Sequence, residues 1–154
     1  MAWNIKCSNS NCEHHTKAVN IVELLSHKHR DDMGWFVCAC GKKAYIEKHF
    51  ELQESGQVWN PYLRGAITLG SENDSYQPFV FLVSYEPLGE ITDVWFSYYK
   101  DLREEGGSLK MGYGPGGPPV LNRHSVLALL MQLIKINYLT PGDVSKAIAE
   151  SANN

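Results

Sequence analysis

The four cysteines of this chain fall into two close pairs, and their spacing constrains the fold more than any other feature. Four residues separate Cys7 from Cys12, 25 residues follow, and one residue separates Cys38 from Cys40, which precedes Gly41. Four cysteines in 154 residues are too few for a disulfide-dense scaffold. With 44% hydrophobic residues, the chain can instead build a hydrophobic core.

The two pairs meet the ligand requirements of a zinc ion. Zn²⁺ is held by four thiolate or imidazole ligands in a tetrahedron, and two close pairs joined by one loop can supply them. Gly41 permits a sharp turn directly after the last cysteine. We therefore predict one structural zinc ion, whose four protein ligands leave no position for water. The expected ligands are Cys7, Cys12, Cys38 and Cys40.

The cysteine pattern leaves other interpretations open. The four cysteines could be free and partly buried, or four thiolates could hold iron instead of zinc. His14 or His15 could replace Cys12 as a ligand, although a cysteine would then stand unused beside the metal. Four thiolates on one Zn²⁺ carry excess negative charge, and four lysines close to the pairs could offset it: Lys6, Lys17, Lys42 and Lys43.

Over about residues 5–50 the chain resembles a zinc ribbon or a related zinc-knuckle module, in which two short cysteine loops clamp the metal. It departs from that pattern in two ways. Both pairs differ from the usual spacing of two intervening residues, and a helix is expected between them. The remaining residues are not recognised as part of a known family.

Hydropathy argues for a cytoplasmic protein without a membrane segment. No stretch approaches the roughly 20 apolar residues that a membrane span requires. The amino-terminal residues do not combine basic residues with a following apolar run, so we expect no secretory signal. In the reducing cytoplasm, clustered cysteines more often hold a metal than form disulfides.

Charge divides the chain near residue 50. Residues 1–50 hold seven Lys and Arg against five Asp and Glu, together with five of the six histidines, whereas residues 51–154 are acidic. We expect a zinc-ribbon-like module over 1–50 and an α+β region over 51–154, which could also share one continuous core with the first part.

Hydrophobic patterning predicts an α+β fold. Within the first part, apolar residues at helical spacing predict a helix over 17–29, and strands are expected at 35–38 and 44–50. A small, mostly antiparallel sheet over about 57–113 follows, with a helical pair over about 123–151 packed on it.

Four strands are expected in the sheet. Pro61 and Gly65 make 58–69 an irregular or edge strand, or two short strands. The continuous apolar run at 79–83 is typical of a core strand buried on both faces. Two further strands are expected at 94–99, antiparallel to the 79–83 strand, and at 109–113.

Both carboxy-terminal helices have recognisable start signals. Asn122 can cap a helix over about 123–138, which is apolar almost all round and is therefore expected to be buried. Thr140 followed by Pro141 and by Asp143 predicts a last helix reaching about residue 151. Its apolar stripe is thin, so we expect it to pack on the preceding helix.

Aromatic residues concentrated in the sheet are the candidates for partner binding. Most must fill the core, and any that remain exposed would mark an interaction surface. The candidates are Trp59, Trp95, Tyr98, Tyr99 and Tyr113.

No catalytic residue is predicted. The Gly- and Pro-rich loop 106–119 lacks the signature of a phosphate-binding loop, but it could cover a groove on the aromatic strands.

Three functions are therefore considered. The first is a non-catalytic interaction module with a structural zinc site, bound to another protein. The second is nucleic-acid binding through the zinc part, although a charge excess of two over residues 1–50 is small for that purpose. The third is an enzyme with a site under loop 106–119. The sequence leaves the oligomeric state open.

Overall fold

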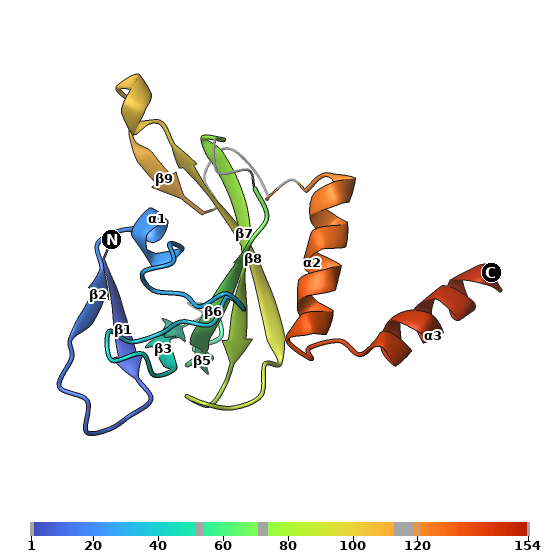
Figure 1. Ribbon diagram of the computed structural model, residues 1–154, viewed down its shortest axis with the longest axis horizontal. Helices are drawn as coiled ribbons and strands as arrows, with labels where there is room; N and C mark the ends of the chain where they lie inside the picture. The colour runs from blue at the N-terminus through green and yellow to red at the C-terminus, as the bar shows by residue number, and fades with distance from the viewer. Residues whose placement is uncertain (1, 52–53, 71–73, 113–118, 120, 154) are drawn as a thin grey trace.

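The computed structural model describes residues 2–51, 54–70, 74–112, 119 and 121–153, and it has the predicted α+β fold (Figure 1). Among these residues, seven strands form one antiparallel sheet in the order β2-β1-β3-β6-β7-β8-β9, and β4 and β5 form a separate hairpin. The large sheet comprises β1 (Trp3–Cys7), β2 (Thr16–Ala18), β3 (Ala44–Glu47), β6 (Tyr62–Thr68), β7 (Tyr76–Ser84), β8 (Asp93–Asp101) and β9 (Leu109–Met111). The hairpin comprises β4 (Phe50–Glu51) and β5 (Val58–Trp59).

Strand β7 lies at the centre of the hydrophobic core, as the apolar run at 79–83 predicts. Phe79 and Phe81 face a cluster that includes β1, whereas Val80 and Leu82 face a second cluster that includes the long helix. Side chains alternate between the two faces of a strand, so a strand buried on both faces requires an unbroken apolar run. The expected antiparallel pairing of β7 with β8 is confirmed.

The sheet and the larger core cluster both continue across residue 50. Trp3 and Ile5 of β1 share this cluster with Phe79 and Val83 of β7. Strand β3 pairs with β1 on one side and with β6 on the other, so it joins the amino-terminal strands to the central ones.

The predicted helix over 17–29 is wrong. Residues up to Ala18 form β2, which pairs with β1, and only α1 (Ile21–Leu24) is helical. Of the apolar residues at helical spacing, Ala18, Ile21 and Leu25 are buried, but pairing with the edge of β1 takes Ala18 into a strand. The Ser26 hydroxyl donates to the Glu23 carbonyl oxygen just after α1, a local bond that competes with continued helix.

The strand expectations around residues 35–69 need two corrections. Residues near 35–37 form only isolated bridges, and the strand expected at 44–50 divides into β3 and the first residue of β4. The segment 58–69 does divide into two strands, β5 and β6, but β6 is an interior strand rather than an edge strand. The expected irregularity is present, as a register shift between Leu63 and Gly65 in the pairing of β6 with β7.

The two carboxy-terminal helices begin where predicted. Asn122 caps α2 (Arg123–Lys135), and a capping box between Thr140 and Asp143 starts α3 (Pro141–Ala152). A short 3₁₀ helix, η1 (Arg103–Glu105), precedes β9. No helix in the described part of the chain is long and apolar enough to cross a membrane.

The predicted packing of these helices is wrong in two respects. The fully buried residues of helix α2 are Ser125, Leu129 and Leu133, whereas Met131 on its outer side is 70% exposed. Helix α3 buries none of its residues and projects away from the body (Figure 1). An apolar residue type is not by itself sufficient for burial, because the single sheet contacts only one side of α2.

A close approach of two glycines fixes the segment before the second cysteine pair against β6. The Ala66 N–H donates to the Gly34 carbonyl oxygen at 2.8 Å, and the Phe36 N–H donates to the Arg64 carbonyl oxygen at 2.9 Å. A Cβ atom on Gly65 would lie 2.3 Å from the Gly34 oxygen, a separation that backbone atoms cannot tolerate.

We therefore expect Gly65→Ala to lower the free energy of unfolding by about 2 kcal/mol, because the backbone must move to relieve the clash. Urea denaturation measures the effect. Gly142→Ala is the matched control, since a Cβ there meets nothing closer than 3.5 Å and the residue lies in an exposed helix. Equal stability of the two variants would contradict the close approach.

Candidate metal centre

The four predicted cysteines come together in the structure. Their Sγ atoms all lie within 4.8 Å of one another. The Cys7 and Cys40 sulfurs are 3.5 Å apart, and the Cys12 and Cys38 sulfurs are 3.7 Å apart. A disulfide bond is about 2.05 Å long, so these are free thiols. Four thiolates at about 2.3 Å from one tetrahedral metal ion would be about 3.8 Å apart, close to the observed separations.

Strand pairing brings the two cysteine pairs side by side. Cys7 ends β1 and is the register partner of Ala44, the first residue of β3. The Ser8 N–H extends this pairing with a bond of 2.9 Å to the Lys43 carbonyl oxygen. The second pair lies in the turn just before β3, so the β1–β3 register places the first loop against the second.

Each cysteine pair is held in a tight turn. In the second turn the Gly41 N–H donates to the Cys38 carbonyl oxygen at 2.8 Å, and Gly41 has a φ of 81°, a conformation that glycine adopts easily. In the first turn the Cys12 N–H donates to the Asn9 carbonyl oxygen at 3.0 Å. The predicted role of Gly41 in a sharp turn is confirmed.

Burial and hydrogen bonds shift the pKa values of Cys7 and Cys38 in opposite directions. Burial opposes ionisation of Cys38, but bonds from the Cys40 N–H and the Thr16 hydroxyl outweigh it and lower the pKa of Cys38 to about 6. Burial raises the pKa of Cys7 to about 12, although the Asn9 N–H donates to its sulfur. A bound cation would therefore have to displace the proton of Cys7, while Cys38 is the more readily ionised ligand.

Thr16 was not a predicted site residue, although it contacts the cluster directly. Its Oγ1 atom lies 3.3 Å from the Cys38 sulfur and accepts a hydrogen bond of 3.1 Å from the Ala39 N–H. This side chain therefore connects β2 to the second cysteine turn. Thr16 is far from Cys38 in the sequence, so no spacing rule could have found it.

The candidate histidine ligands do not join the cluster. Among the residues that the structure describes, the grouped metal-ligating atoms belong to the four cysteines alone. His14 and His15 instead line a separate hollow of about 340 Å³, together with His29. Two of the candidate charge neighbours have other partners: Lys6 pairs with Glu47, and the Lys43 ammonium lies 5.6 Å from the centre of the Trp35 ring.

The aromatic binding candidates do not form one surface. Trp95 and Tyr99 pack against the larger core cluster, whereas Tyr98 lies with its ring centre 5.2 Å from that of Tyr76. Trp59 is 41% exposed on the β4–β5 hairpin. Tyr113 and much of loop 106–119 lie outside the described residues.

Geometry therefore identifies one candidate site, a cluster of four free thiols that could hold a metal ion. The chain matches no protein-family model, and no curated protein or solved structure shows significant similarity to it. The functional assignment therefore depends on the chemistry of this cluster and its surroundings.

Replacing Thr16 with Val should weaken metal binding about tenfold, because it removes the hydroxyl beside the Cys38 sulfur while keeping the shape of the side chain. Competition titration of Co²⁺ and Zn²⁺ against a chelator measures the change. Thr92→Val is the matched control, since the hydroxyl of the exposed Thr92 donates to the Asp93 carboxylate. Unchanged affinity for Thr16→Val would contradict the proposed contact.

Proposed function

We propose that this protein is a zinc-binding, non-catalytic interaction module that contacts another protein in the cytoplasm. One observation carries the proposal, namely that four free thiols from two separate turns lie within 4.8 Å of one another. A site of this type is closed, because the protein supplies all four ligands of a tetrahedral ion. Its role is then to stabilise the fold rather than to activate water or substrate.

Zinc fits this site for chemical reasons. Thiolates are soft ligands, and zinc is a common metal in tetrahedral sites made of four sulfurs. The sulfur separations of 3.5 and 3.7 Å are close to the value of about 3.8 Å expected for such an ion. Iron can occupy the same ligand set, so metal analysis is part of the test.

The local topology supports a relationship to zinc ribbons. The first pair lies at the connection between the antiparallel strands β1 and β2. The second pair lies in a turn flanked by the antiparallel bridge between Val37 and Lys43. Two short cysteine turns that lie against each other match the two metal-clamping loops that the sequence resemblance implies over residues 5–50.

Exposed apolar side chains on the carboxy-terminal helices support a protein partner. Val126, Leu127 and Met131 are exposed on α2, and Ile148 is 63% exposed on α3. Apolar side chains concentrated on a protein surface are typical of protein–protein contacts. The partner would cover the outer side of α2 together with α3.

Nucleic-acid binding is the second candidate, favoured by the hollow beside the first cysteine loop. Its lining includes His14, His15, Lys17, Lys28 and His29. However, four thiolates and one Zn²⁺ carry two negative charges, which cancel the charge excess of residues 1–50. The metal-loaded module would then lack the basic surface that phosphate contacts require.

Purified protein should contain one zinc ion per chain, and Cys38→Ser should lose it. Because the ion would link two turns, we expect the variant to lose about 3 kcal/mol or more of unfolding free energy. Elemental analysis and urea denaturation measure both effects. Ser10→Ala, an exposed change in the first cysteine loop, is the control. The absence of stoichiometric metal in the parent, or a Cys38→Ser variant with unchanged metal content and stability, would contradict the zinc site.

A photo-crosslinking residue at position 131 should form an adduct with a protein partner in cells, whereas the same residue at position 110 should not. Position 131 lies on the outer apolar side of α2, and Lys110 is an exposed residue of β9. Gel analysis after irradiation detects the adduct. Equal labelling from both positions would argue against a helical interface, and salt-dependent retention on nucleic acid would favour the second candidate.

A further inference from the structure

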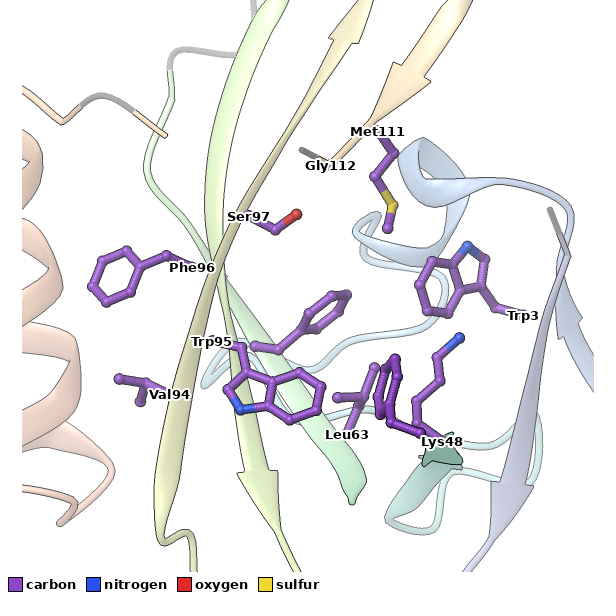
Figure 2. A pocket seen from close by; sticks show the side chains of 11 residues that line it. Trp3, Lys48, Leu63, Val94, Trp95, Phe96, Ser97, Met111 and Gly112 are labelled. Atoms are coloured by element: carbon purple, nitrogen blue, oxygen red, sulfur yellow. The ribbon is translucent and has the colours of Figure 1, made fainter. Parts of the chain in front are cut away.

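A large apolar cavity opens on the face of the sheet where the larger core cluster lies. None of the four cysteines lines it. The cavity has a volume of about 680 Å³, within the range of about 300–1,000 Å³ that is typical of small-molecule sites. Strands β1, β6, β7, β8 and β9 all contribute to its wall (Figure 2). The principal side chains are Trp3, Lys48, Phe50, Phe81, Trp95 and Met111.

The wall is mainly aromatic, and its rings hold one another in place. The Trp3 ring centre lies 5.9 Å from that of Phe81, and the Phe50 ring meets Trp95 edge-on at 5.6 Å. Trp3 and Phe81 are almost fully buried, so this side of the cavity belongs to the rigid core. Figure 2 shows the Trp95 ring directed into the cavity, while Phe96 points to the opposite side of β8. A flat apolar body can stack against such walls.

Lys48 places one cation at this apolar surface. Its ammonium nitrogen lies 4.0 Å from the centre of the Trp3 ring, a cation–π contact. The side chain is partly buried, and burial lowers the pKa of Lys48. Within the part of the chain that the structure describes, the ion pairs join other residues, and none gives Lys48 a carboxylate partner.

We propose that this cavity binds a small aromatic carboxylate, whose rings lie against Phe50 and Trp95 and whose carboxylate pairs with the Lys48 ammonium, close to Trp3. The apolar wall suits the aromatic rings of such a ligand, and the Lys48 ammonium, which has no carboxylate partner among the described residues, suits its negative charge. A charge-assisted bond at the edge of an apolar site is stronger than the same bond in water. The proposal does not depend on zinc, because none of the four cysteines lines the cavity.

The test uses full-length protein as purified with its metal, and two probes of similar shape, 2-naphthoate and the neutral 2-naphthalenemethanol. Titration calorimetry should show that the carboxylate binds roughly tenfold more tightly than the alcohol. Lys48→Met, which keeps an unbranched apolar chain, should remove that tenfold preference and leave the affinity for the alcohol within about twofold. Lys100→Met is the matched control on an exposed residue of β8 outside the cavity, and it should preserve the preference.

A second measurement keeps the proposal testable if Lys48→Met fails to fold. In NMR spectra of the parent protein, 2-naphthoate should shift the indole N–H signals of Trp3 and Trp95 and leave that of Trp35 in place, because Trp35 packs against the other core cluster. Three results would overturn the proposal: no binding of 2-naphthoate at millimolar concentration, equal affinity for both probes, or a shift at Trp35 without shifts at Trp3 and Trp95.

Discussion

The antiparallel pairing of β1 with β3 is the interaction on which the rest of this structure depends. It places Cys7 opposite Ala44 and so brings the first cysteine loop against the second. Because β3 also pairs with β6, the same interaction joins the amino-terminal strands to the central sheet. It further positions Trp3 beside Lys48, at the wall of the aromatic cavity. A shift of one residue in this register would reverse which side chains face the core.

The cysteine cluster lies where β1 and β3 pair, and its charge affects this pairing. Thiolates in close proximity repel one another, so the cluster can ionise fully only with a cation at its centre. Hydrogen bonds from Thr16 and from the turn backbone already favour the ionised form of Cys38, whereas Cys7 holds its proton firmly. A metal ion would therefore connect the end of β1 to the turn before β3 and would strengthen the same register. The β1–β3 pairing would therefore form the metal site, and the bound metal would in turn stabilise the pairing.

Sequence patterns predicted the structure correctly where residues close together in the chain determine it. The apolar run of β7, the Asn122 cap and the Thr140 capping box all rest on residues close in the chain. They failed for the helix expected over 17–29, because the edge of β1 offered backbone hydrogen bonds that local propensity does not include. They also failed for the burial of α2, because the tertiary structure determines whether other elements cover a helix on one side or on several.

The sequence by itself predicted the four cysteines as the metal-binding set, because two close cysteine pairs supply four thiolate ligands, but it left His14 and His15 open as replacements for Cys12. It also determined the fold class, through a run of apolar strands followed by two capped helices. Only the tertiary structure decided that Thr16 contacts the Cys38 sulfur and that Lys48 meets Trp3. These contacts join residues that are 22 and 45 positions apart, and their formation depends on strand register, which no local pattern encodes.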